Sequence, residues 1–170
     1  LPFFLQGSLG RSDVTTGLLL TPWPLATMIM APLAGRLVER IHAGILGGIG
    51  MTVFAAGLFL LAILPENPTN MDIVWRLFIC GAGFGLFQTP NNSTIISSAP
   101  SNRSGGASGM LGTARLRGQT LGATLVAMIF NLVPNNSTQA CLYLATAFAV
   151  VAAIVSSLRI SQPRPLKGFR

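Results

Sequence analysis

Residues 43–64 read AGILGGIGMTVFAAGLFLLAIL, a stretch without a single charged side chain. A helix that crosses the hydrocarbon core of a bilayer needs about 20 consecutive, mostly apolar residues. Residues 43–64 meet that length, so they predict a transmembrane helix. The fold class then depends on whether the rest of the chain repeats this pattern.

Four other stretches repeat the pattern. They cover residues 16–38, 73–98, 105–133 and 140–158. Short segments with the residues typical of turns separate the five stretches. We therefore predict an all-α fold, a polytopic transmembrane helix bundle with five complete spans over residues 16–158. Residues 1–15 are predicted to form the end of a preceding helix and an outer loop, and residues 159–170 a cytoplasmic tail.

The composition of the whole chain agrees with a membrane protein. Of its 170 residues 51% are hydrophobic and only 9% are charged, whereas a soluble domain carries about 25% charged residues. The mean hydropathy is +0.63. These values exclude a soluble enzyme, and the apolar fraction is too high for a disordered chain.

The charged, cysteine and histidine residues argue against three further kinds of function. The net charge is +7, but the basic residues are spread thinly between apolar stretches, so we expect no nucleic-acid partner. Cys80 and Cys141 lie inside apolar stretches, where a small buried hydrophobe is the ordinary role, and no metal site is expected. With His42 as the single histidine, no catalytic set can be assembled, so we expect no enzyme.

The basic residues are distributed unevenly between the two ends of the predicted spans. With five alternating spans, one side carries Arg36, Arg40, Arg103, Arg159, Arg164, Lys167 and Arg170, and the other carries Arg11 and Arg76. Short loops rich in lysine and arginine remain in the cytoplasm. The sequence therefore predicts a cytoplasmic C-terminus and places Leu1 near the outer face of a cell membrane, the inner membrane of a bacterium.

Polar side chains enter the predicted span over residues 73–98. Gln88, Asn91 and Asn92 are spaced i, i+3 and i+4, which places them on one helix face. Pro90 removes one backbone hydrogen bond beside them and permits a kink. Polar groups at bilayer depth indicate function. These residues could line an aqueous cavity, or they could join helices through structural hydrogen bonds.

Two arginines enter the predicted span over residues 105–133. At 1.5 Å per residue, Arg115 lies about 15 Å from the start of that span, where a charge is costly. Arg115 is therefore expected in a packed interior, paired with carbonyl groups or a carboxylate, in either a structural or a transport role. Arg117 lies on a different side of the helix and is expected to reach the interface or a water-filled cleft.

Glycines are dense in the middle and later spans, and many follow the small-xxx-small spacing that lets helix backbones approach closely in lipid. They are Gly47, Gly48, Gly50, Gly81, Gly83, Gly85, Gly105, Gly109, Gly112, Gly118 and Gly122. We expect tight helix packing at these positions. The same residues would also suit a seam along which helices slide.

The loop after the first span contains Gly35, Leu37, Glu39 and Arg40. This pattern resembles the Gly-x-Leu-Ala-Asp-Arg-x-Gly signature of the major facilitator superfamily, with glutamate in place of aspartate and His42 in place of the closing glycine. In that family the signature lies between the second and third helices of each half. The resemblance implies that this segment is a cytoplasmic loop.

Other segments are similar to the fourteen-span branch of the drug:proton antiporters. They are residues 1–6, 17–22, 105–110, 113–115 and 118–122. The resemblance covers nearly the whole chain and implies the C-terminal part of a major facilitator fold, with the five spans as the last five helices. It nominates Gln88, Asn91, Asn92 and Arg115 as residues of the substrate cavity.

The same resemblance implies a function. Members of this branch export lipophilic and quaternary ammonium cations by alternating access and exchange them for protons, without a cofactor. The partners would be the lipid bilayer, a cationic small molecule and an N-terminal half that precedes Leu1 and holds the coupling carboxylate. Two alternatives remain open at this point, a major facilitator transporter of a metabolite and a stand-alone structural small membrane protein.

Overall fold

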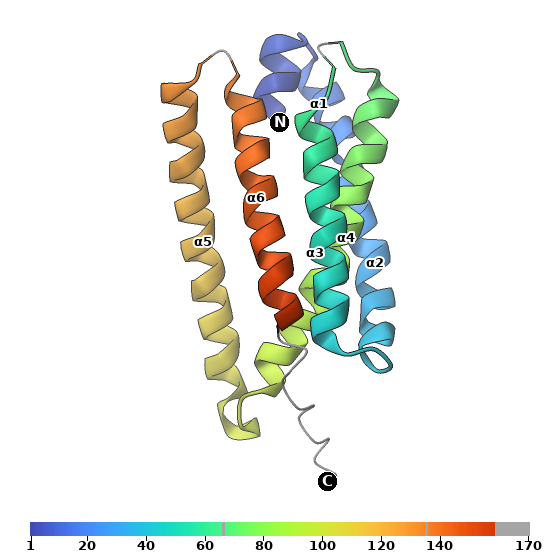
Figure 1. Ribbon diagram of the computed structural model, residues 1–170, viewed down its shortest axis with the longest axis vertical. Coiled ribbons are helices and arrows are strands. Elements are labelled where there is room, and N and C mark those ends of the chain that lie inside the picture. Colours follow the sequence, from blue (N-terminus) through green and yellow to red (C-terminus); the bar gives the residue numbers. More distant parts are fainter. Residues whose placement is uncertain (66, 135, 159–170) are drawn as a thin grey trace.

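The computed structural model describes residues 1–158 except 66 and 135, and its regular elements in that part of the chain are all helical (Figure 1). The elements are η1 (Phe4–Ser8), α1 (Asp13–Leu20), α2 (Pro22–Val38), α3 (Ala43–Ala62), α4 (Asn70–Ser97), η2 (Ser101–Arg103), α5 (Ser104–Leu132) and α6 (Ser137–Leu158). The predicted all-α fold is confirmed. The predicted tail over residues 159–170 lies outside the described residues.

Each predicted span corresponds to helix, with ends that differ by at most three residues. The first span begins at Asp13 and is interrupted at Thr21, between α1 and α2. Pro22 and Pro24 follow directly and have no N–H group to donate to the preceding turn. The Thr21 hydroxyl donates instead to the carbonyl oxygen of Gly17, 2.9 Å away, and steadies this junction.

Four segments in the described part of the chain are long and apolar enough to cross a membrane. They are Asp13–Val38, Ala43–Ala62, Asn70–Ser97 and Ser137–Leu158. α5, at 29 residues, also has the length. Arg115, Arg117 and many small polar residues make α5 less apolar than the other four, so its place in a bilayer remains a prediction.

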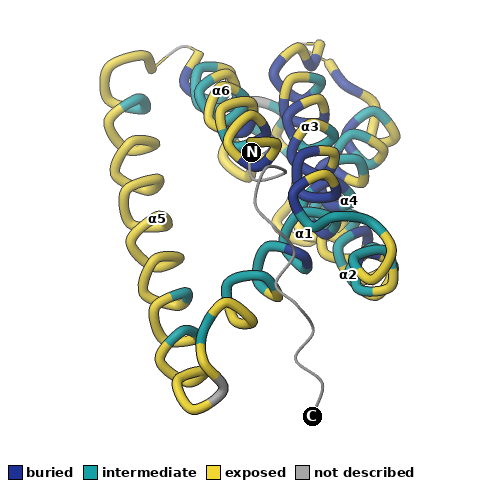
Figure 2. The backbone as a smooth tube through the Cα atoms, turned by 60° about the horizontal axis from the view of Figure 1, so that its bottom comes forward, coloured by how far each residue is buried: buried dark blue, intermediate teal, exposed yellow. Residues whose placement is uncertain are grey.

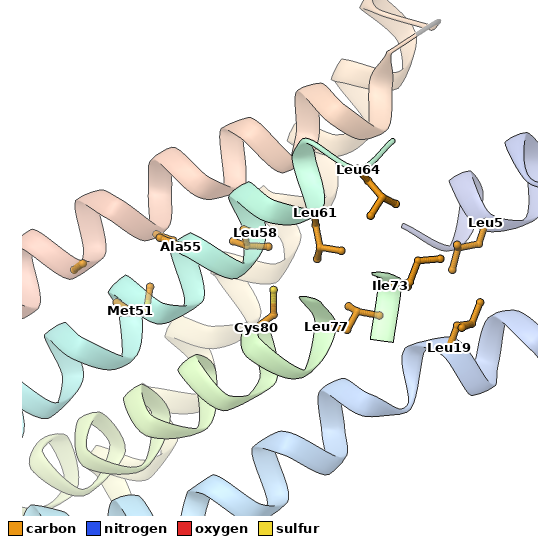
Figure 3. Close-up of a cluster of buried hydrophobic side chains, with 12 residues drawn as sticks. Leu5, Leu19, Met51, Ala55, Leu58, Leu61, Leu64, Ile73, Leu77 and Cys80 are labelled. Atoms are coloured by element: carbon orange, nitrogen blue, oxygen red, sulfur yellow. The ribbon is translucent and has the colours of Figure 1, made fainter. Parts of the chain in front are cut away.

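α4 is the centre of the bundle, with α2 packed on one side and α3 on another, while α6 covers α3. Mostly aliphatic side chains of α3, α4 and α6 form one buried cluster together with Leu5 and Leu19 from near the N-terminus (Figure 3). Leu5, Ile73 and Cys80 are fully buried there. The segment before α1 is therefore anchored on the bundle by Leu5.

Glycines determine how closely α2, α3 and α4 approach. A Cβ atom added to Gly50 would lie 2.6 Å from the backbone nitrogen of Phe87 on α4, and one added to Gly57 would lie 2.9 Å from that of Cys80. On the other side of α4, a Cβ on Gly85 would lie 3.1 Å from the carbonyl oxygen of Thr27 on α2. The predicted tight packing is thus confirmed for these helices.

α5 differs from the rest of the molecule. It stands beside the bundle and has no buried residue (Figures 1 and 2). A Cβ added to any of its six glycines would meet no atom within 4 Å among the described residues. At its far end the ring of Phe130 contacts that of Phe3, with centroids 5.7 Å apart. Tight packing at the α5 glycines is therefore not seen in the described part of the chain.

The start of α4 is fixed by a reciprocal cap. The Thr69 hydroxyl accepts a hydrogen bond from the Asp72 N–H at 3.2 Å, and the Asp72 carboxylate accepts one from the Thr69 N–H at 3.1 Å. This arrangement satisfies two N–H groups that a helix start otherwise leaves without a partner.

We expect Thr69→Ala to lower the free energy of unfolding by about 1 kcal/mol, because the cap loses its acceptor. Thermal unfolding of the protein in detergent measures the effect. Thr113→Ala is the matched control, since the Thr113 hydroxyl donates only to the carbonyl oxygen of Gly109 on its own exposed turn. Equal midpoints for the two variants would contradict this role of Thr69.

Candidate functional site

The C-terminal half of α4 carries the polar residues predicted to line a cavity. Pro90 is buried there, and α4 nevertheless continues as helix to Ser97. The Thr94 hydroxyl donates to the carbonyl oxygen of Pro90 at 2.8 Å. A backbone hydrogen bond is missing one turn before Pro90, so α4 is weaker at this level than elsewhere.

Gln88, Asn91 and Asn92 are all half-buried on α4. Gln88 and Asn92 continue the row of Gly81 and Gly85, the side of α4 that approaches α2. Neither side chain forms a hydrogen bond with another described residue, whereas Asn91 has a partner. The interhelical hydrogen bonds of the structural alternative are therefore not formed by Gln88 and Asn92 within the described residues.

Arg115 and Arg117 occupy opposite sides of α5. Both are exposed, and neither forms a hydrogen bond or ion pair with a described residue. Arg115 follows Ala107 and Leu111 at four-residue intervals, and these two half-buried residues mark the side on which α5 approaches the bundle. Arg115 thus lies on the bundle side of α5 and Arg117 on the outer side. The described residues do not bring Arg115 together with Gln88, Asn91 and Asn92.

The signature-like loop lies at the end of α2. The carbonyl oxygen of Leu37 accepts hydrogen bonds from the N–H groups of Arg40 and Ile41, at 3.0 and 2.8 Å, and ends the helix. Glu39 and Arg40 are exposed. A Cβ added to Gly35 would meet nothing within 4 Å, so no close helix contact is present at this glycine among the described residues.

His42 has a structural role that the sequence did not indicate. It is half-buried and caps the start of α3, because its Nδ1 atom accepts a hydrogen bond from the Gly44 N–H at 3.2 Å. The sequence analysis assigned His42 no structural role and therefore missed this contact. A histidine directly before a glycine-rich helix start was the available signal.

Arg76 is a residue that the sequence analysis did not select as a site. It lies in the second turn of α4, half-buried, with its guanidinium carbon 5.0 Å from the centre of the Trp75 ring. Its Nε and Nη1 atoms are shielded from solvent and find no acceptor among the described residues. An arginine within an otherwise apolar span was the signal that could have identified it.

The main groove in the described part of the chain is not lined by these candidate residues. A groove of about 320 Å³ runs along α3 and α6, lined by Ile45, Gly48, Ile49, Thr52, Val53 and Ser157. It is open and mostly apolar. No group of three potential metal ligands is found among the described residues. The candidate residues therefore lie on helix faces that the described residues alone do not enclose.

Comparisons with known proteins were made for the whole chain. A sequence profile of the Major Facilitator Superfamily matches residues 1–169. The uncharacterized transporter YebQ of Escherichia coli K12 is 64% identical over 164 residues, which are 96% of this chain and 36% of that protein.

More distant relatives have names that refer to drug resistance or to a transported compound. The multidrug resistance protein Stp of Mycobacterium tuberculosis H37Rv is 32% identical over 126 residues, 74% of this chain and 23% of that protein. The riboflavin transporter RibZ of Clostridioides difficile is 28% identical over 130 residues, 76% of this chain and 28% of that protein. This chain thus spans about a third or less of the length of these relatives.

Proposed function

The chain belongs to the major facilitator superfamily, and from this membership we propose that residues 1–170 form the C-terminal part of a proton-coupled multidrug efflux transporter. The observation that carries the proposal is the family match along residues 1–169. The name of the mycobacterial relative supports drug export. We assign the chain to the fourteen-span branch and its substrates to lipophilic and quaternary ammonium cations.

The proposed mechanism is alternating access, in which two halves of a transporter move about a site near the middle of the membrane. α4 contributes Gln88, Asn91 and Asn92, whose half-buried amides provide polar groups inside an apolar bundle. α5 contributes Arg115 from its bundle side. Because the described residues do not enclose these groups, an N-terminal half that precedes Leu1 completes the cavity in this proposal.

Proton coupling is assigned to that N-terminal half. The three acidic residues in the described part of the chain lie at helix ends, with Asp13 and Asp72 in first turns and Glu39 at the end of α2. Proton relays within membranes use carboxylates inside the spans. A carboxylate upstream of Leu1 would therefore carry the proton.

The proposed location is the inner membrane of a bacterium, with the C-terminus in the cytoplasm. Figure 1 shows the α2–α3 turn, the start of α5 and the end of α6 at one end of the bundle. Arg36, Arg40 and Arg103 lie at that end. Their position supports a cytoplasmic assignment for it, because basic loops remain inside.

A second candidate is the export or import of a metabolite. The relative named as a riboflavin transporter matches 76% of this chain. Competition between riboflavin and cationic dyes for transport by the intact protein separates the two candidates. Transport of riboflavin without transport of any cationic dye would favour the metabolite.

We expect the full-length transporter to lower ethidium accumulation in cells several-fold, and residues 1–170 alone to leave it at the level of empty vector. One half cannot enclose a site near the middle of the membrane. Time-resolved ethidium fluorescence measures this, with both proteins at equal membrane abundance. An uncoupler that abolishes the proton gradient should remove the effect of the full-length protein.

Two outcomes would contradict these statements. Ethidium efflux by residues 1–170 alone would refute the need for the other half. Efflux by the full-length protein that persists after uncoupling, while ATP is depleted, would refute proton coupling.

A further inference from the structure

The outer end of α4 contains a guanidinium group with unused hydrogen-bond donors. Arg76 lies six residues, or about 9 Å, from the start of the helix. It shares the side of α4 that approaches α3 with Cys80 and Gly83, one turn nearer the outer end. Its Nε and Nη1 atoms are both shielded from solvent without an acceptor. Buried donors of a charged group rarely remain without a partner.

The nearest carboxylate on the same helix does not accept a hydrogen bond from the buried Nε and Nη1 atoms of Arg76. Asp72 lies one turn before Arg76, but its Oδ2 atom accepts from the Thr69 N–H at 3.1 Å and from the Thr69 hydroxyl at 2.6 Å. No ion pair joins the carboxylate to Arg76 within the described residues. Asp72 interacts with the charge of Arg76, but its carboxylate is engaged by the Thr69 cap and accepts no hydrogen bond from the guanidinium group.

The aromatic neighbour of Arg76 compensates for part of the burial. The guanidinium carbon lies 5.0 Å from the centre of the Trp75 ring, a favourable cation–π distance. The ring supplies no hydrogen-bond acceptor to Nε or Nη1. Carboxylate oxygens are the acceptors with which the donors of an arginine form short, charge-assisted hydrogen bonds. Trp75 is 38% exposed, so this pair of residues is close to the surface of the described bundle.

We propose that Arg76 binds a carboxylate group in the transporter, with Trp75 holding the guanidinium in position. Two sources can supply that group. It can belong to a substrate, in which case Arg76 selects planar cations that also carry an acid. It can also belong to a side chain of the part of the transporter outside residues 1–170. The first source rests on the proposed efflux function, and the second does not.

The experiment uses two dyes that differ in one group. Tetramethylrhodamine and its methyl ester share the planar cationic ring system, but only the first has a free carboxylate. Their dissociation constants are measured for the purified full-length parent and for Arg76→Met, which keeps a long unbranched side chain and removes all donors. Arg103→Met is the matched control, because Arg103 is an exposed arginine at the opposite end of α4. The thermal unfolding midpoint of each dye-free variant is measured as well.

The two sources give different results. For a substrate carboxylate, the parent binds the acid tighter than the ester by about tenfold or more, and Arg76→Met removes this preference without lowering the midpoint. For a carboxylate of the protein, the parent binds both dyes equally. Arg76→Met then lowers the midpoint by about 5 °C or more, because it leaves a buried carboxylate without a partner. Arg103→Met changes neither quantity.

Other results would overturn the proposal. One is equal binding of the two dyes together with an unchanged or raised midpoint for Arg76→Met. Another is a preference for the acid that survives Arg76→Met without a fall in the midpoint. A parent that binds neither dye and no other cation would refute the proposed function instead. The direction of the midpoint shift would then decide alone whether Arg76 has a carboxylate partner.

Discussion

Gly83→Leu is expected to reduce the amount of folded transporter by about tenfold or more, because overpacking of this kind affects stability strongly. A Cβ atom at this position would collide with the backbone nitrogen of Phe54 and would lie 2.7 Å from the carbonyl oxygen of Gly50. Backbone atoms of α3 cannot rotate away as the end of a side chain can. α3 and α4 would therefore have to separate along their whole contact. Fluorescence-detected gel filtration in detergent measures the loss.

Gly106→Leu is the matched control for this variant. Gly106 lies in the first turn of α5, where an added Cβ would meet no atom within 4 Å among the described residues. The same change in side-chain volume is therefore expected to leave the gel-filtration peak near that of the parent. If Gly83→Leu gave a peak equal to that of Gly106→Leu, the close contact of α3 with α4 would not exist in the protein.

Arg115→Ala is expected to lower dye efflux by about tenfold, and Arg117→Ala by less than about twofold. Arg115 lies on the bundle side of α5, in the row of Ala107 and Leu111, and a charge within a membrane span is costly unless it has a function or a partner. Arg117 lies on the opposite side. Initial rates of ethidium efflux by the full-length transporter, divided by membrane abundance, give the comparison.

Arg115→Lys separates a requirement for positive charge from a requirement for guanidinium geometry. If efflux is lost in Arg115→Ala and restored in Arg115→Lys, the positive charge is required. If efflux is lost in both variants, the planar guanidinium group is required. Activity equal to the parent for both Arg115→Ala and Arg117→Ala would remove Arg115 from the candidate site.

The fold was largely predictable from apolar length. All five predicted spans occur as helix, because a stretch such as residues 43–64 has no other stable state in a bilayer. The break at Thr21 was missed, although Pro22 and Pro24 were visible in the sequence. A proline pair permits either a kinked continuous helix or an interruption, and packing on α4 decides between the two.

The glycines show where sequence reasoning reaches its limit. Closely spaced glycines occur in both α4 and α5. Of the glycines in these two helices, only Gly81, Gly83 and Gly85 of α4 lie against a neighbouring helix among the described residues. Spacing identifies a surface on which a helix can pack and does not identify the partner. The isolated position of α5 could therefore not be predicted from residues 105–133.

The candidate site was predictable in composition but not in geometry. Gln88, Asn91 and Asn92 were expected on one helix face, and the place of Gln88 and Asn92 beside α2 depends on which side of α4 the glycines occupy. Arg76 was overlooked because it lies near one end of its span, where an arginine often reaches water. The orientation of its side chain over Trp75 was needed to show that its donors are shielded.

The weak apolar character of α5 has a consequence for the biogenesis of the protein. A translocon passes segments into lipid according to their apparent insertion free energy, to which each central arginine contributes unfavourably. α5 carries two arginines and is followed closely by the much more apolar α6. We therefore expect α5 to enter the bilayer only after α6 has been synthesised, with the two helices inserting together as a hairpin.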